Sequence, residues 1–207
     1  DSVRGLKGVR AHCTLTLFDE EKPVRIERGE ALFTEYGVSG VAAMQLARLA
    51  GQALSAFRQA VLSVSLMDES EAKTQADRRA ALFEGEAMET FFTGLLHKRI
   101  GLCLLREAGI APTDPVSPAL ARRVLPLLSD WRLPVLGVLP FEHAQVTAGG
   151  VPLQEVDGRT LESNLVPGLY LCGETLDVDG DCGGYNLMWA WASGLAAGTA
   201  AAKGGTP

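Results

Sequence analysis

Several motifs that mark common enzyme classes are absent from this sequence of 207 residues. No GxSxG nucleophile turn occurs, because the nearest segment, Gly37-Val38-Ser39-Gly40, has the wrong spacing. No GxxxxGK(S/T) phosphate-binding loop occurs either. The four cysteines form no CxxC pair, which argues against a zinc site or a redox dithiol. We expect Cys172 and Cys182 to be buried, reduced thiols.

Long apolar runs and an excess of positive charge are also absent. No stretch approaches the run of about 20 apolar residues that crosses a bilayer, and DSVRGLKGVR lacks the apolar core of a secretory signal. With 19 Lys and Arg against 25 Asp and Glu, the net charge is −6, which argues against nucleic-acid or anionic-membrane partners. We therefore expect a cytoplasmic protein that acts on a small molecule. Because no Met begins the sequence, we also expect a piece of a longer protein.

The first two thirds of the sequence predict an α+β domain. Residues 9–18 alternate apolar and polar side chains, and a polar turn leads into residues 24–37, which predicts an antiparallel hairpin or meander with one wet face. Ser39 is a candidate N-cap for an amphipathic helix that ends at Gly51. Residues 57–67 predict a further strand.

Helices complete this predicted domain. Residues 69–108 have a helical period rich in charged residues that is interrupted near Gly85, Gly94 and Gly101, which predicts two or three surface helices. Residues 117–131 predict another helix, which begins with a Ser-Pro pair and runs to a tryptophan. We place a domain boundary near residue 138, where Val, Leu and Gly become frequent.

The final stretch predicts the returning end of an α/β domain. Leu169–Cys172 is short and apolar, as expected of a buried strand. An acidic loop then leads through Gly183-Gly184 into a helix of Leu, Met, Trp, Ala and Gly, whose small residues predict tight packing against neighbours. A strand, a glycine turn and a helix N-terminus together suit a ligand with phosphate or electron-rich oxygens.

At these residues the sequence resembles a known family. GLYLCGE, LDVDGDCGGYNL and the Trp/Ala/Gly helix resemble the C-terminal end of the HI0933-like, or BaiN-like, FAD-dependent oxidoreductases. The approach to that end, residues 141–170, and LFTEYGVSG, residues 32–40, also resemble family segments. The resemblance implies that residues 1–138 are an insertion domain that closes over the flavin and shapes substrate access. It implies that residues 139–207 are the C-terminal strand–loop–helix part of a Rossmann-like FAD/NAD(P)-binding domain.

The resemblance also implies where FAD would bind. Glu174, which follows a strand and a glycine, would accept hydrogen bonds from sugar hydroxyls of the ribityl chain. The helix entry at Gly183-Gly184 would face the flavin N1/C2=O edge, where negative charge develops on reduction. The candidate cofactor-binding residues are Thr147, Gly149, Gly150, Gly173, Glu174, Asp179, Gly183, Gly184, Tyr185, Asn186 and Leu187.

Plainer alternatives exist for these candidates. Without the resemblance, Glu174 is equally explained as a solvated turn residue. Gly183-Gly184 is also explained as a turn needed for packing, and residues 146–150 as a type II turn. Trp189 and Trp191 point to opposite sides of a helix, so at most one can face a ligand, and core packing is the default interpretation.

A metal site and a catalytic residue are not predicted. The run Asp177–Asp181 imitates the start of a calcium loop, but Cys182 and Met188 occupy the places that such a loop reserves for Gly and Glu. The alternative is an acidic turn that orders its own backbone. His97 lies in a charged helix and is expected to be structural, and nothing around His143 assigns it a proton-transfer role.

The absence of one further motif sets the functional expectation. A dinucleotide-binding domain begins with GxGxxG after its first strand, and this sequence has no such motif. In the family the motif precedes the insertion, so we expect only the isoalloxazine and ribityl half of the FAD site here. We expect a fragment of an oxidoreductase that passes a hydride between flavin and NAD(P)H or an organic substrate, inactive by itself with or without bound FAD. The alternatives are a non-catalytic interaction module and a subunit completed by a separate dinucleotide-binding chain.

Overall fold

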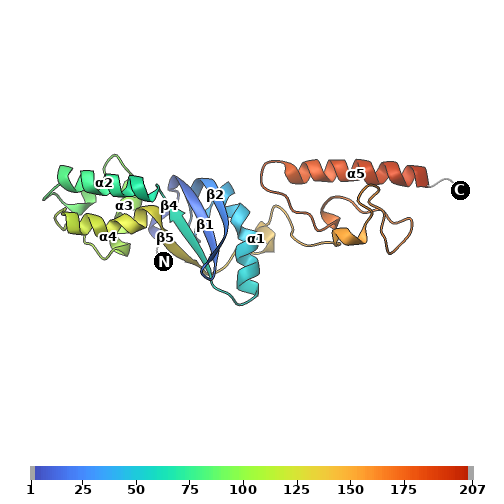
Figure 1. Cartoon of the computed structure of the whole chain (residues 1–207), viewed down its shortest axis with the longest axis horizontal. Helices are drawn as coiled ribbons and strands as arrows, with labels where there is room; N and C mark the ends of the chain where they lie inside the picture. Colours follow the sequence, from blue (N-terminus) through green and yellow to red (C-terminus); the bar gives the residue numbers. More distant parts are fainter. Residues whose placement is uncertain (1–2, 205–207) are drawn as a thin grey trace. The chain divides into compact units, whose positions relative to one another are not determined.

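The computed structural model describes residues 3–204, and the chain divides into two compact units (Figure 1). Unit 1 is Asp1–Val138 and unit 2 is Leu139–Pro207. The division falls where the composition of the sequence changes. Within the described residues, no helix has both the length and the apolar character needed to cross a membrane.

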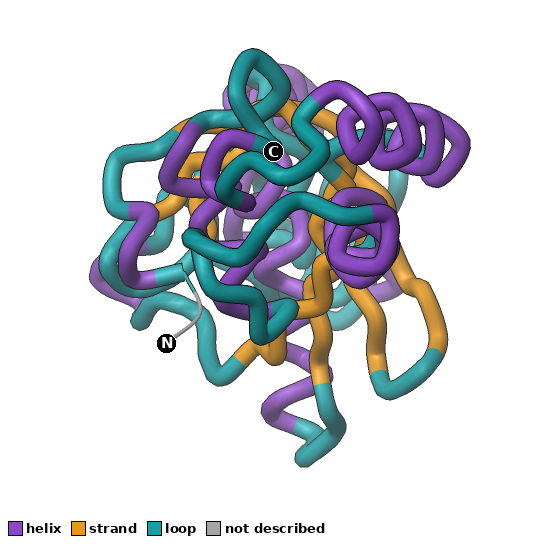
Figure 2. The backbone as a smooth tube through the Cα atoms, turned by 90° about the vertical axis from the view of Figure 1, so that its left-hand side faces the viewer, coloured by secondary structure: helices purple, strands orange, loops and turns teal. Residues whose placement is uncertain are grey.

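Unit 1 is built on a five-stranded sheet with the order β3-β2-β1-β4-β5, and all its pairings are antiparallel. Figure 2 shows the strands in orange. The strands are β1 (Arg10–Asp19), β2 (Lys22–Phe33), β3 (Val38–Ser39), β4 (Ala60–Ser65) and β5 (Trp131–Val135). The predicted hairpin is confirmed by the β1–β2 register, which pairs Thr14 with Arg28. The strand predicted within residues 57–67 is confirmed by β4.

The two faces of this sheet differ in exposure. Leu15 of β1 is fully buried, whereas Ile26 of β2, on the opposite face, is 60% exposed. Helix α1 (Val41–Ser55) packs against β2 on the buried side, where Gln45 Nε2 donates to Glu27 Oε2 at 2.6 Å. Alternation along the strands thus gives one core face and one wet face, as the sequence predicts.

Apart from the short η1 (Arg4–Leu6) before β1, the other helices of unit 1 lie between β4 and β5 in the sequence. They are α2 (Glu69–Leu82), the short η2 (Met88–Thr90), α3 (Lys98–Glu107) and α4 (Pro118–Ser129). These helices gather beyond the end of the sheet at which β4 ends and β5 begins, and α2 packs along α4 (Figure 1). The core continues from the sheet into this helical part, and at their border the Phe33 and Trp131 ring centroids are 5.9 Å apart.

Two helix boundaries differ from the prediction. Ser39 is not an N-cap, because it pairs with Leu32 in β3 and leaves Gly40 at the cap position with φ of 102°. A Cβ on Gly40 would lie 2.6 Å from the Glu30 carbonyl oxygen, so the turn requires glycine. The helix then continues past Gly51 to Ser55, because residues with good helix propensity follow that glycine.

The predicted helix break near Gly101 and the predicted helix end at Trp131 are also wrong. Gly101 does not interrupt the helical segment but lies inside α3, where it is buried against Phe92. One face of α3 is buried and its charged residues are exposed, as in a surface helix that packs on a core. Helix α4 ends at Ser129, so Trp131 is not its last residue but the first residue of β5. Strand β5 lies at the edge of the sheet, where Pro134 is tolerated. The α4 N-cap is as predicted: Ser117 accepts a hydrogen bond from the Leu120 amide.

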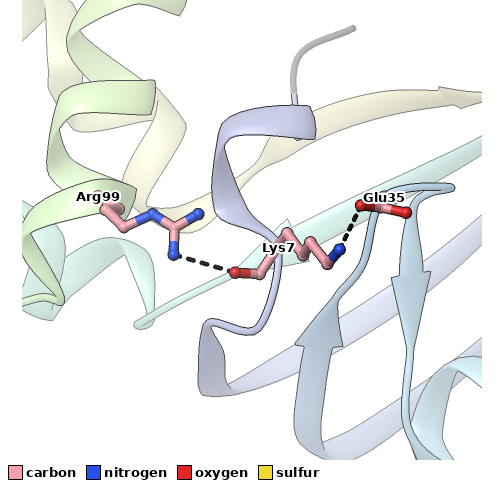
Figure 3. Close-up of polar contacts among 3 residues, drawn as sticks. All are labelled: Lys7, Glu35 and Arg99. Atoms are coloured by element: carbon pink, nitrogen blue, oxygen red, sulfur yellow. Dashed lines mark hydrogen bonds and ion pairs between the residues drawn. The ribbon is translucent and has the colours of Figure 1, made fainter.

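Residues Gly5 and Lys7, near the start of unit 1, are bound to α3 by a guanidinium group, and Lys7 is bound to the loop after β2 by an ion pair (Figure 3). Arg99 of α3 donates from Nη1 to the Lys7 carbonyl at 3.0 Å and from Nε to the Gly5 carbonyl at 2.8 Å. The Lys7 ammonium pairs with Glu35, and this hydrogen bond and charge lower the pKa of that carboxyl group. The family-like segment around Glu35 is thereby connected to α3.

Unit 2 consists of loops, short helical turns and one long helix, α5 (Tyr185–Gly204). Its buried core is small and contains Val156, Leu161, Leu176 and Ala197. The prediction of a buried strand at Leu169–Cys172 is wrong, because Leu169 is 43% exposed and this stretch makes only an isolated bridge, between Tyr170 and Glu162. A buried strand needs paired neighbours on its edges, and the described part of unit 2 forms no multi-stranded sheet.

Candidate functional site

Helix α5 begins at a pair of glycines around which the predicted site residues lie. Gly183 and Gly184 have φ of 132° and 91°, a backbone region that favours glycine. The Gly184 carbonyl accepts a hydrogen bond from the Met188 amide at 3.0 Å, and the amides of the intervening first turn lack partners within the helix, as in any α-helix. Among the described residues, nothing lies within 4 Å of the position that a Gly184 Cβ would take. A ligand can therefore approach this backbone closely.

Asn186 ties the acidic loop back onto the helix start. Its Oδ1 accepts from the Gly180 amide at 2.7 Å, and its Nδ2 donates to the Gly180 carbonyl at 3.0 Å. Asp179, next to Gly180, is half-buried. The side-chain amide of Asn186 is thus bound to backbone, whereas the side chains of Tyr185 and Leu187 are exposed.

Glu174 lies in a short 3-10 turn, η5 (Gly173–Thr175), that packs against α5. The Gly173 amide donates to Ser193 Oγ at 2.9 Å, and Trp189 Nε1 donates to the Gly173 carbonyl at 3.0 Å. Both groups come from α5. The Glu174 side chain is exposed, so its carboxylate is accessible to a ligand.

The segment with Gly149 and Gly150 runs beside the residues that follow η5. The Gly149 amide donates to Asp177 Oδ1 at 3.1 Å. Gly150 has φ of 146°, and a Cβ there would lie 2.8 Å from the Leu176 backbone, so only glycine fits. Thr147 lies in the preceding loop and is exposed. The structure thus joins the two glycines to the acidic loop.

The acidic loop makes contacts of its own. Within residues 3–204, no three His, Cys, Asp or Glu side chains form a group that could hold a metal ion. The Asp177 carboxylate accepts from the Gly149 amide, so it holds a segment 28 residues earlier in the chain rather than the backbone of its own turn. Asp179 and Asp181 also interact with other groups.

The structure also places the histidine and the cysteines that the sequence analysis singled out. His97 accepts a hydrogen bond at Nδ1 from the Arg99 amide and caps α3, which confirms its predicted structural role. The expectation that Cys172 and Cys182 are buried is wrong, because both are free and exposed. They flank η5 and the helix start, which lie on the surface of unit 2, whereas Cys103 lies in the core of unit 1.

The side chains of Trp189 and Ser193 hold η5 in place and were not predicted as part of the site. Trp189 and Trp191 do point to opposite sides of α5: Trp189 is half-buried, whereas Trp191 is 77% exposed. Trp189 does not only pack, because its indole N–H binds the Gly173 carbonyl. Ser193 is buried one turn further on, and its spacing of four residues from Trp189 was the available sequence signal.

Comparisons with known proteins agree with the resemblance seen in the sequence. A family model described as "HI0933-like protein Rossmann domain" matches residues 21–200. A 3-dehydro-bile acid delta(4,6)-reductase from Clostridium scindens is 34% identical over 206 residues, which are 95% of this chain and 49% of that protein. A ribosomal RNA dihydrouridine synthase from Escherichia coli is 32% identical over 82% of this chain and 41% of its own length. A protein of the same name from Haemophilus influenzae is 29% identical over 81% of this chain and 41% of its length. The chain thus spans about half the length of the curated relatives it matches.

Proposed function

This chain belongs to the HI0933-like family, and we propose that it forms the flavin end and the substrate cap of a FAD-dependent oxidoreductase in the cytoplasm. The observation that carries the proposal is the open helix start at Gly184 with the exposed Glu174 on a turn fixed to the same helix. In this proposal unit 2 binds the isoalloxazine and ribityl half of FAD. Unit 1 is the insertion domain that shapes access to it.

The residues at the α5 start fit such a cofactor. Glu174 would accept hydrogen bonds from ribityl hydroxyls, because an exposed carboxylate can accept from two neighbouring donors. The first-turn amides after Gly184 and the positive end of the helix dipole would stabilise negative charge at the pyrimidine edge of the flavin. Bound FAD would supply two-electron hydride chemistry, with NAD(P)H as the proposed electron donor.

The names of the relatives suggest a class of substrate. Both a delta(4,6)-reductase of 3-dehydro-bile acids and a dihydrouridine synthase are named for the hydrogenation state of a carbon–carbon double bond. In a 3-ketone with delta(4,6) bonds, and in uridine, the precursor of the dihydrouridine that the second name gives as product, that bond is conjugated to a carbonyl group. We propose the same reaction class here: hydride adds to the carbon remote from the carbonyl, and a proton adds to the carbon next to it. The net charge of −6 favours a small molecule over RNA.

Helix α5 has a surface for a dinucleotide-binding partner. Leu187 and Met188 are each 64% exposed, Trp191 is 77% exposed and Leu195 is 74% exposed. Their spacing places them along one side of the helix, opposite the buried Ser193. Exposed apolar side chains in such a row mark an interaction surface. We propose that its partner is a segment with a parallel sheet and the GxGxxG motif, since the chain spans about half of its relatives and lacks this motif.

The experiment is an absorption spectrum and a fluorescence titration of the purified chain with FAD. They are done for the chain alone and together with a GxGxxG segment from a relative. We expect saturable binding, weakened about tenfold or more by Glu174→Ala, since a charged hydrogen bond is lost. Glu142→Ala, an exposed glutamate of the same unit, is the control and should bind like the wild type.

The outcomes separate the alternatives. Binding by the chain alone supports the half-site, and binding only with the added segment supports a subunit completed by another polypeptide. If neither sample binds FAD, the oxidoreductase proposal fails and a non-catalytic interaction module is the better description. If the chain binds a ribosomal RNA fragment with micromolar or tighter affinity, the small-molecule proposal fails.

A further inference from the structure

The turn that presents Glu174 is held by two hydrogen bonds from one side of α5. Trp189 Nε1 donates to the Gly173 carbonyl at 3.0 Å, and Ser193 Oγ accepts from the Gly173 amide at 2.9 Å. Residues four apart lie on the same side of a helix, so both side chains reach the same peptide unit. Both backbone polar groups of Gly173, the residue just before Glu174, are therefore fixed to the helix.

The Ser193 hydroxyl is itself held by the backbone of α5. Ser193 is only 2% exposed. Its hydroxyl donates to the Trp189 carbonyl at 2.5 Å and accepts from the Gly173 amide. A serine has one donor and can accept through two lone pairs, so this hydroxyl is satisfied on both sides. Alanine at this position could make neither of these bonds. The hydroxyl thus specifically connects the turn to the helix.

A third residue on the same side of the helix holds the second loop. Asn186 binds both the amide and the carbonyl of Gly180. Asn186, Trp189 and Ser193 are spaced by three and four residues, which places them in one row along α5. The loop with Glu174 and the loop with Asp179 are therefore fixed to one row of side chains, directly after the open helix start.

We propose that Trp189 and Ser193 are positioning residues for the flavin site: they hold the Glu174 carboxylate in register with the α5 N-terminus. The inference rests on the proposed function. A carboxylate on a fixed turn loses less conformational freedom when it accepts ligand hydroxyls than one on a mobile loop. Neither side chain needs to touch the cofactor for this effect.

The test is FAD binding by Ser193→Ala and Trp189→Phe, measured in whichever form of the wild type binds flavin. Each variant keeps most of the packing and removes one hydrogen bond, so we expect the Kd to rise about five- to tenfold. In a Glu174→Ala background the same substitutions should change the Kd less than about twofold, because the group they position is absent. A change of equal size in both backgrounds would show a merely structural role and overturn the proposal.

Matched controls exist for both substitutions. Ser163 Oγ accepts from the Leu165 and Val166 amides in another loop of unit 2, so Ser163→Ala should leave the Kd unchanged. Trp131 is buried in unit 1, and its indole nitrogen has no hydrogen-bond partner in the described part of the chain. Trp131→Phe breaks no hydrogen bond but leaves a void in the core of unit 1, so it should lower stability without changing the Kd.

A readout without flavin completes the test. The Gly173 amide should exchange with solvent at least about tenfold faster in Ser193→Ala than in the wild type, since its acceptor is lost. An unchanged exchange rate would show that the hydrogen bond from the Gly173 amide to Ser193 does not hold the turn. A wild type that binds no FAD in any form removes the proposed function and this inference with it, whereas flavin binding that is insensitive to both variants removes the inference alone.

Discussion

Gly101 and Gly51 both lie inside helices, yet the same substitution should change stability in opposite directions at these two residues. A Cβ on Gly101 would lie 2.6 Å from the Phe92 ring, so Gly101→Ala should destabilise the chain by about 1–3 kcal/mol. A Cβ on Gly51 would lie 3.5 Å from Val138 Cγ2, an ordinary contact, so Gly51→Ala should stabilise by about 0.5–1 kcal/mol through helix propensity. Urea unfolding of both variants measures this. Shifts of the same sign would contradict the packing described for α3.

The cysteines differ in their expected reactivity. Burial raises the pKa of Cys13 to about 11, partly offset by a hydrogen bond from the Ala31 backbone, and burial also raises the pKa of Cys103. Only thiolates react with iodoacetamide, so the exposed Cys172 and Cys182 should be modified in the native chain at pH 8. Cys13 and Cys103 should react only after unfolding. Mass spectrometry of the alkylated chain tests this, and native modification of Cys13 would contradict its burial.

The same pKa shift predicts a pH effect on stability. Between the ordinary thiol pKa of about 8.5 and the raised value, the folded state keeps the Cys13 proton that the unfolded chain loses. This contribution to stability is complete below about pH 8.5 and is lost as the pH rises toward the folded pKa. Unfolding at pH 8 and pH 10.5 should show the loss, and Cys13→Ala should reduce it. An equal loss in both proteins would assign the effect to other groups.

Among the elements, α5 differs most from its predicted packing. Its small residues predict a helix that packs tightly against neighbours, but only the side with Ser193 and Ala197 is buried. The opposite side exposes Trp191 and Leu195. The apolar residues on both sides of α5 are suited to packing against a neighbour. The exposed side, with Trp191 and Leu195, is the surface proposed to bind the dinucleotide-binding segment.

This exposed side gives a prediction for the chain by itself. The wild-type chain should self-associate with increasing concentration, since a row of exposed apolar side chains favours association. The double variant Trp191→Lys/Leu195→Lys should remain monomeric and keep its helix content. Sedimentation velocity and circular dichroism measure both. A wild type that is monomeric at millimolar concentration would contradict the prediction, and Ala197→Lys, on the buried side, should instead unfold unit 2.

At the scale of the whole molecule, the two units have very different cores. Unit 1 joins a sheet and the helices α1 to α4 around one continuous core, whereas the buried core in the described part of unit 2 has four apolar residues. Residues 1–138 alone should therefore unfold cooperatively, and residues 139–207 alone should not, because so little apolar area is buried. Thermal unfolding of the two separate fragments tests this. A cooperative transition in the fragment 139–207 would contradict it.

The sequence by itself determined several local elements and the family. Alternation predicted the β1–β2 hairpin, a Ser-Pro pair predicted the start of α4, and paired glycines predicted the entry into α5. These features depend on neighbouring residues, whose conformational preferences are legible in a short window. The same is true of the family motifs, which lie within continuous segments.

Only the tertiary structure decided which groups meet. That Gly40 rather than Ser39 occupies the cap position depends on the approach of the Glu30 carbonyl, and the place of Gly101 in α3 depends on Phe92. The role of Ser193 depends on a turn twenty residues earlier in the chain. A periodic pattern shows which side of an element is apolar, but not which partner packs against that side. Contacts between separate elements, and the open side of α5, are set by how the whole chain packs.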